Sequence, residues 1–395
     1  MPSRVSAWED ANLMKHHNYH RYRHPQGITL IEVMFASGIA LFGLLVVVAL
    51  IPLAGNEVRV GLQTDRMASL GRNAVKEFDI RGMRDPNQWS LQDGSAVFVD
   101  TTPGHLGWFT GMVDGKAQYL PQPQAYAIDP RFVTRHGNVP FPYSGNAKWK
   151  IPRISLRTRN PLPAANGNPV FTPLTQLTAD QLFMARDDLV LNFPDDRTLM
   201  SRPNFGLPSR KRQSRGELSW MATVVPLNIL AANQVTRQFD DEYLLSIVVF
   251  SARNLATQER AGQVDSEVAN VPERTCNIDL LSGGFTGGDV ILKHPIHNQV
   301  TNKKLFAENV LKLQTNSWVM LSGQLDSNNN SRRYFRWYRV LNVSPAGVQK
   351  GAATRRVTLQ GADWELPNAN TQATIMEGVI GVFEKKIRLD HSSLW

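Results

Sequence analysis

The chain has 395 residues, 42% hydrophobic and 19% charged, a composition typical of folded globular proteins and unlike that of disordered or collagen-like chains. Its formal net charge of +9 is a mild positive excess, which suits anionic partners in general but specifies none of them. Cys276 is the single cysteine, so a disulfide within the chain is excluded and we expect the fold to depend on packing.

Residues 1–27 form a hydrophilic leader that carries four basic and two acidic residues. Positive charge ahead of the first apolar span holds that end of a chain in the cytoplasm, so we expect the later residues to lie outside. No small-residue cleavage site follows the apolar run that comes next, and the sequence therefore gives no indication of ordinary signal-peptide removal.

Residues 31–53 are predominantly apolar and carry one charged residue, Glu32. About 20 helical residues cross a bilayer core of about 30 Å, so this stretch is long enough to span a membrane. A carboxylate inside such a segment is unfavourable by a few kcal/mol, which makes Glu32 a candidate functional residue. The alternative is a plain signal anchor whose carboxylate reaches the headgroups, since Glu32 is only about one helical turn from the cytoplasmic edge.

The sequence Gly-Ile-Thr-Leu-Ile-Glu at residues 27–32, together with the apolar run after it, resembles the N-terminus of type IV prepilins and pseudopilins. In that family a prepilin peptidase cuts after a glycine and leaves a hydrophobic first residue, which is methylated, and a glutamate in fifth place. The resemblance implies cleavage after Gly27, methylation of Ile28 and a role for Glu32 in assembly. It covers about residues 21–78. Two features depart from the usual pattern, because Ile28 replaces the common phenylalanine and Pro52 comes later than in major pilins.

Cleavage and assembly at this motif also have a physical explanation in the charges of the residues involved. Cleavage after Gly27 would expose a charged amine at the end of an apolar helix. In a helical fibre, Glu32 of one subunit would face the N-terminal amine of a neighbour, and each would neutralise a charge that apolar surroundings penalise. Gly27 has no Cβ, which lets a protease approach the backbone closely.

The helix is expected to continue beyond the apolar run. Apolar residues recur near helical spacing from Val58 to Phe78 with charges between them, which predicts an amphipathic stretch with its apolar stripe against a globular head. Pro52 is expected to kink the helix or let it restart. Gly61 and Gly71 lower helix propensity, so we expect bends or a melted turn there. The prediction is one long helix over residues 28–80.

Residues 81–265 are predicted to form the first part of a β-rich head. The best strand candidates are residues 217–226 and 243–251, both dense in β-branched and aromatic side chains, and they are expected to pair as a hairpin beneath the helix's apolar stripe. Residues 106–110 are predicted to be a loop with aromatic side chains. Thr178 is expected to cap a short helix over residues 178–184.

Residues 266–395 are predicted to form a second, C-terminal β-rich region. Three segments indicate successive antiparallel strands: residues 315–321, 332–343 and 355–360. A closing strand is expected over residues 375–389. The middle segment alternates arginine with aromatic residues, a pattern that suits glycan or nucleic-acid stacking but is more typical of arginine stems covering rings on a sheet surface. The whole chain is therefore assigned to the α+β class.

The other motifs give only weak indications of a binding or metal site. The basic residues between Arg202 and Arg215 suit an anionic partner, or a solvated loop. His294 and His297 lack the further ligands that zinc needs, and Asp289 lacks the acidic spacing of a calcium loop. The glycine-rich residues 283–288 lack the lysine of a phosphate loop. No catalytic residue, cofactor, metal or specific nucleic acid is predicted.

The sequence thus predicts a structural subunit that is a minor pilin or pseudopilin of a type IV pilus or type II secretion fibre. Its expected partners are a prepilin peptidase, other pilin or pseudopilin subunits and the lipid of the bacterial cytoplasmic membrane, which its helix would cross once with the head outside. The alternative is an unprocessed signal-anchored envelope protein whose head binds a ligand or a surface.

Overall fold

The computed structural model describes residues 29–102, 105–113, 115–120, 123–144, 149–159, 171–185, 189–191, 212–214, 217–227, 242–255, 272–281, 287–297, 300–324, 333–364, 366 and 370–390. The chain divides into two compact units, residues 1–63 and residues 64–395. Helix α1, Leu30–Ile80, crosses this division, and its two stretches are described separately. α1 is helical through Pro52, Gly61 and Gly71, so the expected melted turn at the glycines is wrong.

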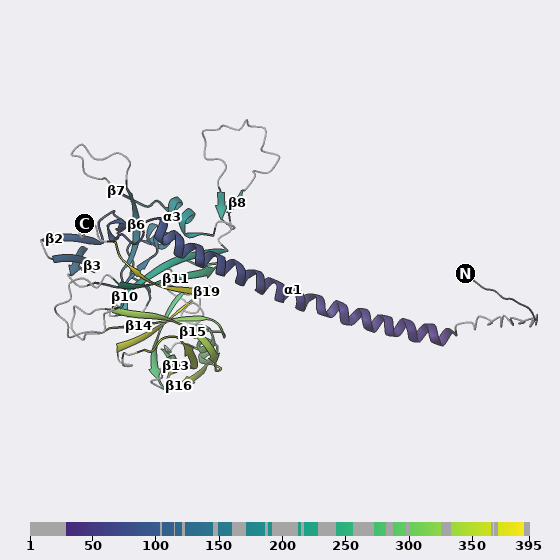
Figure 1. The fold of residues 1–395 in the computed structure, drawn as a ribbon. Coiled ribbons are helices and arrows are strands. Elements are labelled where there is room, and N and C mark those ends of the chain that lie inside the picture. The colour runs from purple at the N-terminus through teal and green to yellow at the C-terminus, as the bar shows by residue number, and fades with distance from the viewer. Residues whose placement is uncertain are drawn as a thin grey trace, which may run out of the picture. The chain divides into compact units, whose positions relative to one another are not determined.

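A β-rich head follows α1, which confirms the α+β class with a long N-terminal helix (Figure 1). Its central sheet has the order β1–β6–β5–β10–β11–β19, and β7 also pairs with β6. All neighbours pair antiparallel except β5 and β6. The strand bounds are β1 Trp89–Ser90, β5 Tyr126–Ile128, β6 Arg153–Arg159, β7 Phe171–Pro173, β10 Leu218–Pro226, β11 Glu242–Ser251 and β19 Val379–Arg388.

β10 and β11 form the centre of this sheet, and their predicted pairing is confirmed over their whole length. Every residue of β10 is buried, because both faces of the sheet are covered. Successive side chains of a strand point to opposite faces. Trp220 and Val224 therefore pack in one core with Phe78 of α1, whereas Met221 packs in another core with Trp337.

The second sheet closes into a six-stranded antiparallel barrel, because β13 pairs with both β12 and β17. The order around the barrel is β13–β12–β18–β14–β15–β17, with β16 paired to β17. The strand bounds are β12 Glu273–Leu280, β13 Gly287–Pro295, β14 Trp318–Gln324, β15 Arg333–Val343, β16 Gly347–Gln349, β17 Ala352–Gln360 and β18 Thr371–Met376. The predicted antiparallel succession of the last third is confirmed. Closure removes exposed sheet edges from this part of the head.

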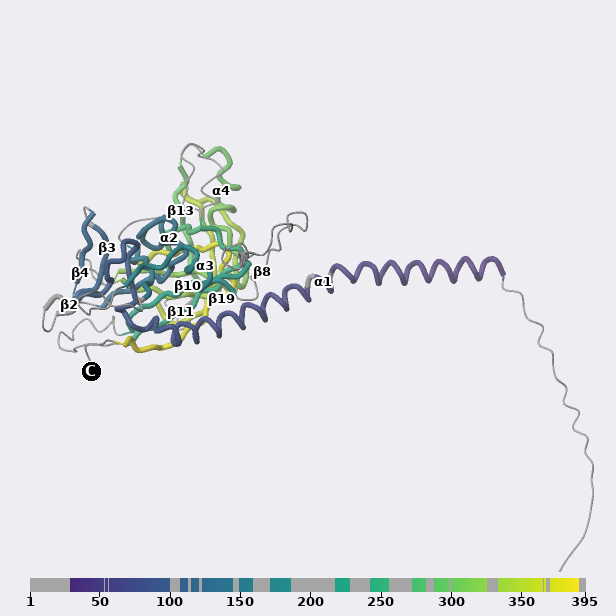
Figure 2. Tube along the Cα trace, turned by 90° about the horizontal axis from the view of Figure 1, so that it is seen from above, coloured from purple at the N-terminus to yellow at the C-terminus, as the bar shows by residue number. Residues whose placement is uncertain are grey.

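The barrel has its own core and carries helix α4, Lys303–Val310, at one end beside β13 (Figure 2). Phe306, Ala307 and Val310 of α4 join the barrel core. Cys276 is buried in that core, and desolvation raises the pKa of its thiol to about 12.

The closing strand expected over residues 375–389 is present as β19 over residues 379–388. Its predicted start is wrong, because the chain turns at Gly378 and residues 375 and 376 belong to β18. β18 belongs to the barrel, whereas β19 pairs with β11 in the central sheet. Gly378 adopts a φ of 80°, a left-handed conformation that glycine tolerates well. The predicted limit between residues 265 and 266 consequently does not separate the two sheets.

The remaining elements are short. β2 Phe98–Thr102, β3 His105–Val113 and β4 Lys116–Leu120 form a three-stranded sheet, and β8 Leu189–Leu191 pairs with β9 Arg212–Ser214. The predicted loop at residues 106–110 is therefore wrong, because those aromatic residues lie in β3 and Trp108 joins the core beneath α1. The helices are η1 Pro86–Gln88, α2 Pro130–His136 and α3 Gln176–Phe183. Thr175, not Thr178, caps α3.

A buried ion-pair network joins the central sheet to the barrel. The Arg153 Nη2 atom lies 2.7 Å from both carboxylate oxygens of Glu273, the first residue of β12. Arg253 donates to both oxygens of Asp129 at 2.9 and 2.6 Å, and Arg153 reaches the same carboxylate at 3.3 Å. These four side chains are at most 4% exposed, so each charge depends on its partners rather than on water.

Candidate anchoring and assembly helix

The first stretch of α1 exposes nearly all of its apolar side chains. Large apolar residues there have between 54% and 79% of their surface exposed: Leu30, Ile31, Val33, Met34, Phe35, Ile39, Leu41, Phe42, Leu44, Leu45, Val46, Val47, Val48, Leu50 and Ile51. By length and composition α1 is able to cross a membrane, with a mean hydropathy of 2.7 over its most apolar window. An apolar surface of this extent marks a site of contact with lipid or with other proteins.

The start of α1 is closed by a reciprocal capping interaction between Thr29 and Glu32. The Thr29 backbone N–H donates to the Glu32 carboxylate at 3.1 Å, and the Glu32 backbone N–H donates to the Thr29 hydroxyl at 3.4 Å. The Thr29 hydroxyl also donates to the same carboxylate at 3.2 Å. This is the capping box, in which threonine at the cap and glutamate or glutamine three residues later satisfy backbone donors that the helix leaves free.

Glu32 therefore has a local role that the sequence reasoning missed, although the Thr-x-x-Glu spacing signals it. Its carboxylate is exposed and already accepts two hydrogen bonds from Thr29. The two predicted processing residues, Gly27 and Ile28, lie outside the described residues.

The second stretch of α1, from residue 64, packs against the central sheet through two glycine contacts. A Cβ on Gly71 would lie 2.1 Å from the Phe383 ring, and a Cβ on Gly381 would lie 2.6 Å from the Met67 sulfur. Each glycine thus makes room for a large side chain of the other element. Ala74 and Phe78 complete the contact and are 1% and 0% exposed. The predicted apolar stripe against the head is confirmed for these residues.

Asp79 fixes the end of this stretch. Its carboxylate accepts from Arg84 Nε and from Lys385 Nζ of β19, both at 2.7 Å. Burial by itself raises the pKa of Asp79, but the two basic partners outweigh burial and hold the pKa below its usual value. The sequence carries no signal that pairs Asp79 with a residue 306 positions later.

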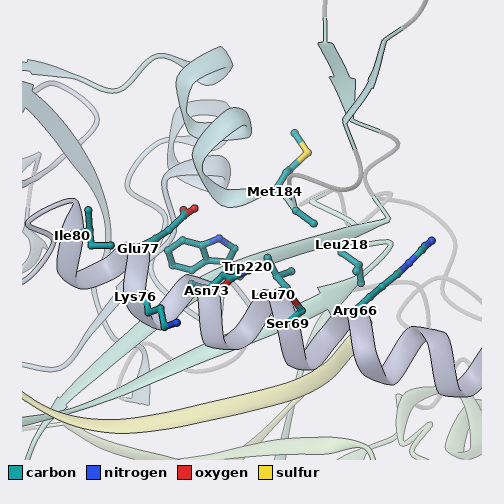
Figure 3. Close-up of a pocket in the computed structure, with 12 residues that line it drawn as sticks. Arg66, Ser69, Leu70, Asn73, Lys76, Glu77, Ile80, Met184, Leu218 and Trp220 are labelled. Carbon is teal, nitrogen blue, oxygen red and sulfur yellow. The ribbon is translucent and has the colours of Figure 1, made fainter.

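A groove of about 350 Å³ runs beside the second stretch of α1. Figure 3 shows the Trp220 ring behind the helix, with Arg66 on the side nearer the start of the chain. The lining combines apolar side chains with the charged side chains of Arg66, Lys76 and Glu77. It leaves part of this helix face open next to the buried contact with the sheet.

The remaining candidates have structural surroundings. Asp289 accepts hydrogen bonds from Thr358 and Arg356 of β17. His294 is half-buried, and the centre of its ring lies 5.9 Å from the centre of the Phe306 ring. His297 is exposed. Among the described residues no group of three or more metal-ligating side chains gathers. The glycine-rich and basic segments fall almost entirely outside the described residues.

The arginine and aromatic residues of β15 divide between the core and the surface. Tyr334, Phe335 and Trp337 are buried between the barrel and the central sheet, where the Trp337 Nε1 atom donates to Thr223 at 3.2 Å. Arg339 is exposed and donates to Asn316. The expected sheet surface of rings covered by arginine stems is therefore wrong for these aromatic residues, because the barrel packs on the central sheet and places the rings in a core.

Comparisons with known proteins identify no family. A search against protein-family models finds no match, and neither does a search of curated proteins. Among solved structures, a reovirus attachment protein, sigma1, in complex with alpha-2,3-sialyllactose, aligns over 59% of this chain and 95% of its own length, with 9% sequence identity and a TM-score of 0.15. A TM-score this low is no sign of a shared fold.

Proposed function

We propose that the chain is a pilin-like structural subunit, a minor pilin or pseudopilin, which a prepilin peptidase cleaves after Gly27. The mature chain would begin at Ile28 and cross the bacterial cytoplasmic membrane once, with the head outside. It would then join a type IV pilus or a type II secretion fibre through its apolar helix. In this role the protein is an assembly component and not an enzyme.

The observation that carries this proposal is the part of α1 over residues 30–51, which exposes large apolar side chains on all its sides and has one carboxylate in its first turn. A soluble subunit would leave this surface in water at a large cost in free energy. Lipid covers such a surface before assembly, and helices of neighbouring subunits cover it in a fibre. The docking of the second stretch on the central sheet fits the same design, because it attaches the head to the anchor.

The alternative is a signal-anchored envelope protein that keeps its leader and uses the head to bind a ligand or a surface. Mass spectrometry of the protein from bacterial membranes distinguishes the two. An N-terminus at Ile28, with or without a methyl group, is expected for the subunit. An intact leader in a strain with an active prepilin peptidase would overturn the proposal.

The role of Glu32 is tested by two variants that separate its charge from its capping hydrogen bond. Glu32→Gln keeps an acceptor for the Thr29 N–H, because glutamine also serves in a capping box, but removes the charge. Glu32→Ala removes both. If the charge pairs with the amine of a neighbouring subunit, both variants reach the membrane and both are incorporated poorly into fibres.

If Glu32 acts only in the capping box, Glu32→Gln assembles like the unaltered chain and Glu32→Ala loses helix stability by about 0.3–1.5 kcal/mol. Membrane fractionation and the subunit content of sheared or secreted fibres provide the measurement. Normal assembly of both variants would contradict a role for this carboxylate in the fibre.

A further inference from the structure

Positive charge is concentrated in one part of the barrel. Residues 291–360 contain eleven lysine and arginine residues and two acidic residues, a net charge of +9. The formal charge of the whole chain is also +9, so the rest of the chain is balanced. Acidic residues on either side of this stretch reduce the net charge of the whole barrel, residues 273–376, to +5. The positive excess that is left suits an anionic partner.

Several of these basic side chains form hydrogen bonds or ion pairs with other residues of the head. Arg355 donates to the backbone carbonyls of Ser344 and Leu311 at 2.9 and 2.6 Å. Lys293 and Arg356 pair with Asp279 and Asp289. Arg333 and Arg336 face Thr110 and Tyr334. These groups have structural roles and leave a smaller set at the surface.

Four exposed lysines remain at the α4 end of the barrel: Lys303, Lys304, Lys312 and Lys350. We call this set the lysine end. α4 packs against β16 and β17, and Lys350 lies in the turn that joins these two strands. Lys312 follows Leu311, whose carbonyl is bound by Arg355 of β17. The four ammonium groups therefore belong to one end of the barrel, where Glu308 is the one acidic residue of α4.

Two exposed apolar side chains accompany the lysine end. Leu305 of α4 is 52% exposed and Val348 of β16 is 38% exposed. Lysines around a few exposed aliphatic side chains match an interface of anionic headgroups above acyl chains, where the charges attract and the aliphatic groups insert.

We propose that the lysine end binds the anionic phospholipid headgroups of the membrane in which α1 is anchored. This inference depends on the proposed anchoring, because the anchor keeps the head at a high local concentration of lipid. Each lysine near an anionic bilayer strengthens association about fivefold. The contact would hold the head at the membrane before assembly and would be released when the subunit leaves the bilayer.

Nucleic acid is the weaker candidate for this surface. Binding of single strands uses aromatic side chains on which bases stack, and the described residues of α4 and β16 expose none. The free charges are lysines, which act as point charges, whereas bidentate recognition of phosphate favours arginine.

The test uses the full chain with a fluorescent reporter at the lysine end. Leu305→Cys is labelled with the environment-sensitive dye NBD, and Cys276 is buried and protonated, so it should not react. The chain is reconstituted into vesicles of phosphatidylcholine alone or with about 30% phosphatidylglycerol. We expect blue-shifted, stronger emission only with phosphatidylglycerol, reversed by about 1 M NaCl, which shortens the Debye length to about 3 Å.

The controls separate this inference from the anchoring proposal. Leu177→Cys, an exposed position on α3, should show no difference between the two lipids, and the double variant Lys303→Glu with Lys304→Glu should abolish the shift at position 305. Equal emission in both vesicles, or a shift with an oligonucleotide but not with phosphatidylglycerol, would overturn the lipid contact alone. Failure of the chain to float with phosphatidylcholine vesicles would overturn the anchoring, and the lipid contact with it.

Discussion

Two phenylalanines in α1 show how differently the two stretches of one helix are used. Phe42 is 76% exposed and Phe78 is 0% exposed. Around Phe42 the helix is apolar on every side, whereas the stretch around Phe78 has polar residues between its apolar ones. A helix that is apolar all round needs an external apolar environment, and an amphipathic one buries its stripe against its own domain. The same residue type therefore stabilises the head at one position and contacts other molecules at the other.

The largest effect should come from truncating these two phenylalanines in turn. Phe78→Ala leaves a cavity between α1 and the central sheet, so we expect the free energy of unfolding of the head to fall by about 3–5 kcal/mol. Phe42→Ala shortens a side chain that is mostly exposed and should change it by less than about 0.5 kcal/mol. Urea unfolding in detergent, followed by tryptophan fluorescence, measures both. An equal decrease in the free energy of unfolding for both variants would contradict the view that only Phe78 stabilises the head.

Two of the five glycines of α1, Gly61 and Gly71, should respond to the same substitution with opposite signs. Gly71→Ala places a methyl group 2.1 Å from the Phe383 ring, and relieving this overlap should destabilise the head by about 1–3 kcal/mol. Gly61 has no atom within 4 Å of the added Cβ, so Gly61→Ala should stabilise the helix by up to about 1 kcal/mol. Thermal unfolding measures the first change, and hydrogen exchange of the amides near residue 61 measures the second. A tolerated Gly71→Ala would show that α1 does not pack closely on β19.

The smallest effect concerns Asp79, at the end of the docked stretch. Its pKa is lower in the folded head than in the unfolded chain, so its contribution is complete above the unfolded value of about 3.9 and is lost as the pH falls towards the folded value. Asp79→Asn should remove about 0.2–1 kcal/mol at neutral pH, because the ion pairs are partly exposed. The difference between the two proteins should shrink as unfolding is measured at pH 5, 4 and 3. If the difference in unfolding free energy stays the same at all three pH values, the charge of Asp79 does not contribute to the stability of the head.

Much of the fold follows from local patterns in the sequence. The spacing of apolar residues gave the long helix, and the β-branched, aromatic segments gave β10, β11 and the strands around the barrel. The aromatic residues of β3 were misinterpreted because His105–Val113 contains two glycines and no clear alternation. Gly71 was misinterpreted because propensity describes an isolated helix, while the position is determined by the Phe383 ring.

Long-range contacts between charges could not be predicted from one sequence. Arg153 and Glu273 are 120 residues apart, and Asp129 and Arg253 are 124 residues apart. Nothing near any of these residues distinguishes it from a solvated surface charge. The network is visible only once the sheet and the barrel are in contact, and the same holds for the gathering of four lysines at the α4 end.

The place of β19 in the chain has a consequence for how the protein is made. β19 pairs with β11 and supplies the ring over Gly71, yet it is synthesised after every other described strand. Contacts between residues more than 300 positions apart form slowly, because a long loop must close first. Before β19 has emerged, α1 has no complete surface to dock on, and the backbone N–H and C=O groups along one edge of β11 stay unpaired. A newly made chain therefore needs protection from its neighbours until β19 has been translated, and a premature stop before Val379 would leave the helix and the sheet without their common support.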